Sequence, residues 1–157
     1  MSSPAIIRRA RASDAAAISS LIQQHVASGT LLPRAPEFIA ERAIDFLVAT
    51  ADARVVGCVH LEEYSPSLAE VRSIVVDAAY QRRGLGAALL NAVEGLARTR
   101  EYRTLFAVSN NDAFFRSRGY LPRDIPELSR ERSEVTRFKG VYAKDLAGSG
   151  ERGARGG

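Results

Sequence analysis

VRSIVVDAAYQRRGLG, residues 71–86, is the stretch that decides the fold. Its apolar run, Ser73–Val76, is short and β-branched, which is typical of a buried strand. Asp77–Tyr80 interrupts this run, and from Leu85 onward apolar residues recur at helical spacing. The stretch therefore predicts a strand, a basic turn that contains two glycines, and a long helix that continues to about Arg100.

This order of elements is typical of an anion-binding site. The first N–H groups of a helix have no partner within the helix, and the helix dipole adds partial positive charge there. Gly84 and Gly86 lack a Cβ, so a phosphate can approach the backbone, and Arg82 and Arg83 add formal charge. The simpler interpretation is a tight turn with two solvated arginines. The combination of strand, basic turn and long helix favours phosphate binding.

Two other phosphate-binding motifs are excluded by the same residues. The turn contains no Gly-Lys-Ser or Gly-Lys-Thr, so it is not a P-loop. Leu89 stands where the third glycine of a Rossmann fingerprint would be, so a dinucleotide site is not expected.

The motif Q-R-R-G-L-G, after a strand that ends in V-V-D, resembles the acyl-CoA-binding motif of the GNAT superfamily of N-acetyltransferases. The resemblance extends from about Ile6 to Leu146. It implies an α/β (α+β) fold with a mixed, mostly antiparallel sheet of about six or seven strands, a V-shaped splay and about four helices. It also implies acetyl-CoA as co-substrate and no metal.

In that family the turn holds the pyrophosphate of coenzyme A, and the preceding strand offers backbone groups to the pantetheine arm. The resemblance implies that coenzyme A is contacted by the strand end, the turn and two later positions: Val75, Val76, Gln81, Arg82, Arg83, Gly84, Leu85, Gly86, Ala87, Asn110 and Phe115. Asn110 and its neighbour Asn111 could equally cap a short helix, and both roles can hold at once.

Acetyl transfer to an amine requires a neutral amine, a stabilised oxyanion and a departing thiolate. GNAT enzymes often place the general base where Glu70 stands. Glu62 and His60, on one face of the neighbouring strand, are second choices, and the ordinary role of all three is a surface group. Backbone N–H groups near Ile74 or Val75 would hold the oxyanion.

The leaving thiolate has no obvious proton donor. GNAT enzymes often carry a tyrosine where this chain has Phe115, which cannot donate a proton. Either the thiolate leaves unaided, since a thiol pKa is about 8.5, or Tyr142 or Tyr120 serves instead.

Within the superfamily, three segments resemble the acetyltransferase domain of N-acetylglutamate synthase. Leu31–Arg34 resembles the loop whose arginine binds the amino acid, and Phe114–Tyr120 resembles a W-F-x-x-R-G-F segment. Thr136–Lys139 resembles an R-x-S segment with a second carboxylate-binding arginine, although Lys139 replaces the serine. The implied substrate-binding residues are Leu32, Arg34, Arg72, Arg137 and Lys139.

These cations suit a dicarboxylic amino acid, because arginine pairs bidentately with carboxylate. Arg72 could instead be a structural partner of Glu70. The implied function is acetylation of the α-amino group of a small amino acid, above all L-glutamate, as in arginine biosynthesis. A GNAT enzyme for another amine (a protein N-terminus, an antibiotic or a polyamine) and a non-catalytic acyl-CoA-binding module remain open. The synthases usually carry a preceding amino-acid kinase domain, so a short stand-alone form is expected here.

Composition agrees with one domain at 1–146 and a Gly/Arg-rich tail at 147–157. The 157 residues include 22 basic and 18 acidic side chains, a net charge of +4 that suits a polyanionic co-substrate. Nucleic acid is not expected, since no basic stripe carries interleaved aromatics. No apolar run approaches the ~20 residues of a membrane helix. The N-terminus lacks the apolar core of a signal peptide, and the chain has a single cysteine, Cys58; both features indicate the reducing cytoplasm. Cys58 is expected to be an inert core thiol. The expected partner is a small-molecule amine, and a homodimer is left open.

The remaining pattern predicts the other elements by their periods. Ser13 and Asp14 are expected to cap the first helix, and Gly57 is expected where another backbone comes close. The expected strands are 5–9, 46–50, 55–63, 69–76, 103–108 and 140–143, and the expected shorter helices are 36–44 and 113–118. The strand at 69–76, the long helix and the strand at 103–108 fit a strand–helix–strand crossover.

Overall fold

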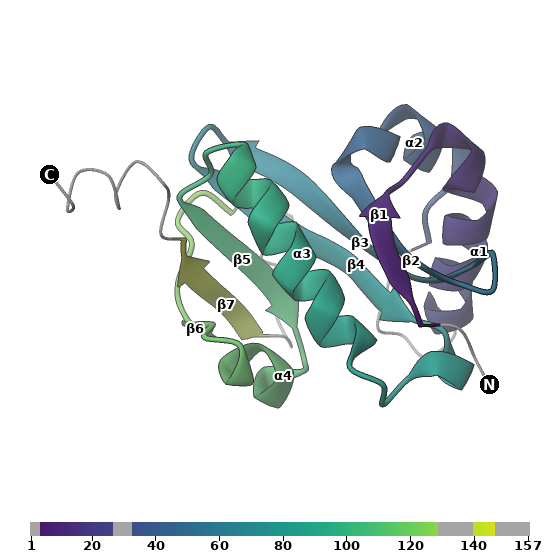
Figure 1. Ribbon diagram of the computed structural model, residues 1–157. Helices are drawn as coiled ribbons and strands as arrows, with labels where there is room; N and C mark the ends of the chain where they lie inside the picture. The colour runs from purple at the N-terminus through teal and green to yellow at the C-terminus, as the bar shows by residue number, and fades with distance from the viewer. Residues whose placement is uncertain (1–3, 27–32, 129–139, 147–157) are drawn as a thin grey trace, which may run out of the picture. The chain divides into compact units, whose positions relative to one another are not determined.

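The computed structural model describes residues 4–26, 33–128 and 140–146 (Figure 1). The strands of this part are β1 (Ile6–Arg9), β2 (Phe46–Ala51), β3 (Arg54–Ser65), β4 (Leu68–Val76), β5 (Thr104–Ser109), β6 (Leu121–Pro122) and β7 (Gly140–Asp145). Its α-helices are α1 (Ala15–Val26), α2 (Pro36–Glu41), α3 (Leu85–Thr99) and α4 (Asp112–Ser117). None of the described helices is long and apolar enough to cross a membrane.

The strands form one seven-stranded sheet in the order β1-β2-β3-β4-β5-β7-β6. The pairs β1/β2, β2/β3, β5/β7 and β6/β7 are antiparallel, and β4/β5 is parallel. Since α3 joins the two parallel strands, the predicted strand–helix–strand crossover is confirmed. The mixed, mostly antiparallel sheet with four helices is the fold class that the sequence predicted.

The chain divides into two compact units. The first comprises residues 1–62 and 71–95, and the second comprises 63–70 and 96–157. The turn that follows β4 therefore belongs to the first unit, and α4 belongs to the second.

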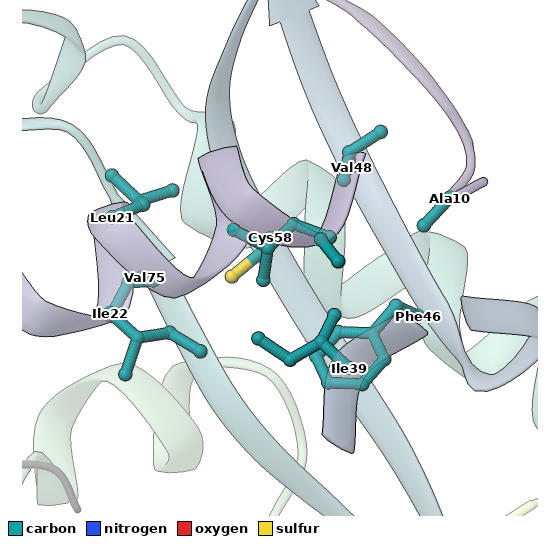
Figure 2. Close-up of a cluster of buried hydrophobic side chains, with 10 residues drawn as sticks. Ala10, Leu21, Ile22, Ile39, Phe46, Val48, Cys58 and Val75 are labelled. Atoms are coloured by element: carbon teal, nitrogen blue, oxygen red, sulfur yellow. The ribbon is translucent and has the colours of Figure 1, made fainter. Parts of the chain in front are cut away.

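The first unit has a core between its sheet and the helices α1 and α2 (Figure 2). Alternate residues of a strand point to opposite faces, so Cys58 and Gly57 face opposite sides of β3. The Cys58 side packs against the two helices, whose buried side chains repeat at helical spacing. The buried residues of this cluster are Ala10, Ala15, Ile18, Leu21, Ile22, Ile39, Phe46, Val48, Cys58 and Val75.

The opposite side of β3 meets α3 at Gly57. A Cβ built on Gly57 would lie 3.0 Å from Leu89 Cδ1 and 3.3 Å from the carbonyl oxygen of Val75. The predicted close approach of another backbone at this glycine is therefore confirmed, and a helix side chain approaches it as well.

The start of α1 differs from the prediction. A 3-10 turn at Ala12–Asp14 precedes the helix, and its N-cap residue is Arg11 rather than Ser13. The Asp14 carboxylate accepts the Arg11 N–H at 2.7 Å and pairs with Arg8 at 2.8 Å. Asp14 thus ties the turn to β1, and the pKa of its carboxyl lies below the usual range because Arg8 binds it.

Two further boundaries were wrong for local reasons. The helix expected at 36–44 ends at Glu41 and is followed by a separate 3-10 turn, Ala43–Asp45. The strand β6 was missed because it is two residues long and contains a proline, which the periodic pattern cannot register.

The second unit has its own core over β5 and β7. Its buried residues are Leu68, Phe106, Ile125 and Ala143, with Tyr64, Val108, Leu128 and Val141 packed against them. The parallel ladder between β4 and β5 pairs Leu68, Ala69 and Glu70 with Thr104, Leu105 and Phe106 in that order.

Candidate functional site

The turn between β4 and α3 is held in place by hydrogen bonds at its β4 end. The Asp77 N–H donates to the Val56 carbonyl at 2.8 Å, which ties the end of β4 to β3. The Asp77 carboxylate accepts the Ala79 N–H at 2.9 Å. The amide of Gln81 reaches back to the Val76 carbonyl at 3.1 Å. The exposed turn is therefore anchored before α3 begins at Leu85.

Two residues of this turn adopt the left-handed backbone conformation. Arg82 has a φ of 65° and Gly84 a φ of 78°. Such turns aim successive N–H groups to one side and form concave anion sites. A Cβ built on Gly84 meets nothing within 4 Å, so the backbone is open to a ligand there. The turn is followed by a helix N-terminus whose first N–H groups have no helical partner. The arrangement has the shape and charge to hold a diphosphate.

One arginine of the turn is held by an aromatic ring. The guanidinium carbon of Arg83 lies 5.0 Å from the centroid of the Tyr80 ring. A cation over an aromatic face is attracted to it, which narrows the range of positions that the guanidinium takes. Arg82, Arg83 and Gly84 are exposed, as an anion site requires.

A second polar group in the first unit gathers around His60 and is hereafter called the His60 cluster: Arg34, Phe38, Arg42, His60, Glu62 and Arg72. His60 stacks on Phe46 with ring centroids 4.2 Å apart and an angle of 2° between the rings. The Phe38 ring stands edge-on to His60 at 6.2 Å. The guanidinium carbons of Arg34 and Arg42 lie over Phe38, at 5.2 and 3.9 Å from its centroid.

The backbone at Arg34 is also fixed. The Ser19 hydroxyl of α1 donates to the Arg34 carbonyl at 2.6 Å. Since Phe38 lies four residues further on, at the first turn of α2, its ring lies beside the Arg34 side chain. The loop arginine that the sequence singled out is therefore held by α1 through its backbone and by α2 through its side chain.

Arg72 of β4 forms an ion pair with Glu62 of β3. Arg72 Nη1 lies 2.5 Å from Glu62 Oε2. Burial raises the pKa of Glu62, but the hydrogen bond and charge of Arg72 outweigh it, so this pKa lies below its ordinary value. The sequence left Glu70 open as a structural partner of Arg72, and the structure shows an ion pair of Arg72 with Glu62.

His60 and Glu70 are not the surface groups that the sequence predicted. They are 1% and 2% exposed. Burial is the largest cause that lowers the pKa of His60, to about 4. The charges of Arg72 and Arg34 also lower this pKa, whereas the charges of Glu62 and Asp45 raise it. A neutral imidazole at ordinary pH follows. The hydrophobic periodicity of the sequence could not predict this burial, because a single polar or charged residue on a strand gives no indication of which residues cover it.

The strand before the turn contains an irregularity. Ser73, in the middle of β4, has a φ of 52°. Its carbonyl accepts the Cys58 thiol at 3.3 Å. Left-handed backbone at a serine re-aims the neighbouring peptide groups, among them the N–H groups of Ile74 and Val75. Glu70 lies before this irregularity and belongs to the second unit, whereas Ile74 belongs to the first.

The expected inertness of Cys58 agrees with its surroundings. Its side chain is fully buried, and burial raises the pKa of its thiol to about 12. A thiol that stays protonated is a poor nucleophile.

Two predicted co-substrate contacts lie in the second unit. Asn110 is exposed, and the helix cap is supplied by Asn111, whose side chain accepts the Phe114 N–H at 3.2 Å. Phe115 is 3% exposed and stacks parallel to Tyr142 at 6.3 Å between ring centroids. A hydrogen bond with Asp112 raises the pKa of the Tyr142 hydroxyl. Tyr120, the other proposed donor, is fully buried edge-on to Phe115.

Three predicted substrate residues, Leu32, Arg137 and Lys139, lie outside the described residues. Of the five predicted substrate residues, Arg34 and Arg72 are therefore the two whose surroundings are seen, and both belong to the His60 cluster. Within the described ranges no group of three or more His, Cys, Asp or Glu could hold a metal ion.

The sequence reasoning missed Phe38 and Arg42 as members of this cluster. Their spacing from Arg34 is four and eight residues, but only Phe38 lies within α2, since Arg34 precedes the helix and Arg42 follows it. That spacing becomes a usable signal only once α2 is known to run from Pro36 to Glu41.

The family described as "Acetyltransferase (GNAT) domain" matches residues 42–122, which lie within the domain expected at 1–146. An uncharacterized N-acetyltransferase of Chlorobaculum tepidum is 33% identical over 114 residues, which cover 73% of this chain and 74% of that protein. The amino-acid acetyltransferase of Pseudomonas fluorescens is 26% identical over 136 residues, or 85% of this chain. The match covers 32% of that enzyme, so the chain spans about a third of its length.

Among solved structures, N-acetylglutamate synthase from Neisseria gonorrhoeae, complexed with coenzyme A and N-acetyl-glutamate, superposes with a TM-score of 0.83 at 25% identity. The superposition covers 92% of this chain and 36% of that chain. The similarity therefore concerns one part of a longer synthase.

Proposed function

The chain belongs to the GNAT acetyltransferase family, and we propose that it transfers the acetyl group of acetyl-CoA to the α-amino group of a small amino acid, with L-glutamate as the favoured acceptor. The observation that carries the choice of acceptor is the pair Arg34 and Arg72 of the His60 cluster, whose guanidinium groups lie beside a buried aromatic stack. The likeness to amino-acid acetyltransferases and to N-acetylglutamate synthase supports the same choice. Such an activity would serve arginine biosynthesis.

The co-substrate is acetyl-CoA, and its diphosphate fits the turn that precedes α3. The open backbone at Gly84 and the N–H groups of Leu85, Gly86 and Ala87 would receive it, with Arg82 and Arg83 adding charge. Gln81, which is anchored to Val76, would shape the turn. Val75 and Val76, at the end of β4, and Asn110 and Phe115, in the second unit, would contact the pantetheine arm and acetyl group.

The reaction forms one C–N bond and breaks one C–S bond. The neutral amine attacks the thioester carbonyl, the oxyanion is held by the N–H of Ile74 or Val75, and the C–S bond then breaks to release the thiolate. Glu70, directly or through water, takes the proton that the ammonium gives up before attack, and the proton that the nitrogen loses after the C–N bond forms passes to solvent. The thiolate takes its proton from solvent, since Phe115 has none to give and a thiol pKa of about 8.5 permits unaided departure.

The acceptor would be held by its carboxylates. Arg34 is fixed in position through Ser19 and Phe38, which lowers the entropy lost when it pairs with a carboxylate. Arg72 is charge-compensated by Glu62 and would act as a hydrogen-bond donor more than as a net charge. Arg137, Lys139 and Leu32 would complete the acceptor site.

The compartment proposed is the cytoplasm. Acetyl-CoA is a cytoplasmic metabolite, and the cysteine of the chain, Cys58, is a free thiol, as expected in a reducing compartment.

Steady-state release of the coenzyme A thiol tests the proposal. The acceptors compared are glutamate, glutamine, aspartate, a polyamine and a peptide with a free N-terminus. Wild type should turn over an acidic or amide amino acid fastest. The R34A variant should raise the KM for glutamate by about tenfold or more, because one charge-assisted hydrogen-bonded pair is lost. R42A is the matched control, since Arg42 lies over the same ring, and should change this KM less than threefold.

Each alternative has its own result in this experiment. Preference for the peptide or polyamine would contradict the amino-acid acceptor and support another GNAT activity. Binding of acetyl-CoA without turnover of any amine would support a non-catalytic module. An R34A variant with the wild-type KM would remove Arg34 from the acceptor site.

A further inference from the structure

One ring nitrogen in the first unit has no use in the chemistry described so far. His60 Nδ1 is buried and has no hydrogen-bond partner among the described residues, and the whole side chain is 1% exposed. Buried polar atoms in folded proteins are nearly always bonded, so an unpartnered one calls for an explanation. A ligand that supplies the missing partner is one such explanation.

Two aromatic rings hold the plane of the His60 imidazole. Phe46 covers one face of the imidazole at 4.2 Å, and the two rings are within 2° of parallel. Phe38 stands edge-on at 6.2 Å with an angle of 89°. These contacts fix the plane in which Nδ1 forms its hydrogen bond, as a binding site for a defined ligand requires.

The unpartnered nitrogen lies within the group proposed to bind the acceptor. The charged side chains that act on His60 come from four elements: Glu62 on its own strand, Arg72 on β4, Asp45 on the turn before β2, and Arg34 before α2. Arg34 and Arg72 are two of the proposed acceptor-binding residues. An amino acid held by them has its polar ends close to this imidazole.

His60 is unsuited to act as the general base. Burial lowers its pKa to about 4, whereas the α-ammonium group that must lose a proton has a pKa of about 8. Proton transfer to His60 would be strongly uphill. A neutral imidazole, in contrast, makes hydrogen bonds well, with Nδ1 as an N–H donor in one tautomer and an acceptor in the other.

We propose that His60 is a specificity-determining residue of the acceptor site, and that its Nδ1 hydrogen-bonds the side-chain carboxylate or carboxamide of the acceptor amino acid. This inference rests on the proposed function and deepens it. It assigns the acceptor class as amino acids whose side chain ends in a planar, oxygen-bearing group. A site built with a hydrogen-bonding group discriminates against acceptors that lack the matching group, because the buried nitrogen then stays unpaired.

Three substitutions separate the hydrogen bond from the shape of the ring. His60→Asn keeps an amide near the position of Nδ1, His60→Gln places it near Nε2, and His60→Phe keeps a flat ring without nitrogen. H60F and H60Q should raise the KM for glutamate or glutamine about tenfold, while H60N should stay within about threefold of wild type. The kcat and the KM for acetyl-CoA should change less than about twofold in all three.

Two controls use the same proteins. With alanine as acceptor, all three variants should match wild type, because no side-chain group reaches Nδ1. The ratio of KM between H60F and wild type should be constant from about pH 6 to 8.5, since a group with a pKa of about 4 stays neutral throughout. Glu62, Arg72, Asp45 and Arg34 are present in both proteins, so their titration cancels in that ratio.

The outcomes are distinct. If H60F keeps the wild-type KM and melts at a higher temperature, the nitrogen is only an unsatisfied core atom and the inference is overturned. If H60N behaves like H60F, Nδ1 is not the contact, which also overturns it. If wild type still turns over glutamate in either case, the proposed function stands. If wild type neither binds nor turns over any amino acid, the proposed function and the inference are both overturned.

Discussion

At the scale of single residues, the turn before α3 depends on backbone that only glycine adopts at low cost. Arg82 and Gly84 have φ angles of 65° and 78°. A left-handed conformation costs an L-residue about 1–2 kcal/mol. The turn already carries that strain at Arg82, which indicates that the surrounding contacts of Asp77 and Gln81 determine its shape.

We expect Gly84→Ala to lower the free energy of unfolding by about 1 kcal/mol and to raise the KM for acetyl-CoA. The cost is backbone strain alone, because an added Cβ meets nothing within 4 Å. Urea denaturation and steady-state kinetics measure the two effects.

Gly95→Ala is the matched control for that change. Gly95 lies in the interior of α3, also with nothing within 4 Å of an added Cβ, and its φ does not lie in the left-handed range. The same methyl group should stabilise the protein there by about 0.5–1 kcal/mol, because alanine is the better helix former. If alanine lowered the free energy of unfolding at both positions, the strain argument would be contradicted.

At the scale of elements, β3, β4 and α3 meet at one small residue. Gly57 lets Leu89 of α3 and the Val75 carbonyl of β4 approach within 3.0 and 3.3 Å of where a Cβ would stand. Leu89 is completely buried, so its side chain cannot move aside freely. The same packing holds the strand that leads into the turn proposed to bind phosphate.

Gly57→Ala should therefore lower the free energy of unfolding by about 2 kcal/mol, the usual cost of overpacking a core. A double-mutant cycle with Leu89→Ala, read by denaturant unfolding, checks the contact. The two changes should be less than additive, since removal of the Leu89 side chain relieves part of the crowding. Strict additivity would show that the Val75 carbonyl alone resists the new methyl group.

At the scale of the whole molecule, ligand binding and stability are linked. A ligand that binds only the folded state stabilises it by about 2.7 kcal/mol at one hundred times its Kd. Acetyl-CoA should therefore raise the Tm by several degrees, as measured by differential scanning fluorimetry. Acetyl-pantetheine, which carries the same thioester without the nucleotide diphosphate, should raise it little.

The R82A/R83A double variant provides the control for that shift. It should keep the Tm of the free protein within about two degrees, since both side chains are exposed, and should lose most of the shift with acetyl-CoA. If both ligands shift the Tm equally, the diphosphate does not bind at the turn.

The order of the main elements and the place of the turn that we propose to bind phosphate were determined by the sequence alone. Strand and helix periods are local properties, and the turn residues from Gln81 to Gly84 are contiguous with the elements on either side. The fold class and the crossover from β4 to β5 were predicted for the same reason.

The makeup of the His60 cluster was decided only by the tertiary structure. Its members Arg34, His60 and Arg72 come from three segments, and no local period brings them together. The burial of His60 and the pairing of Arg72 with Glu62 follow from how α2, β2, β3 and β4 pack. From the sequence alone, a charged or polar residue is expected at the surface. Only the neighbours packed around His60 show that its imidazole is buried and that Nδ1 has no partner among the described residues.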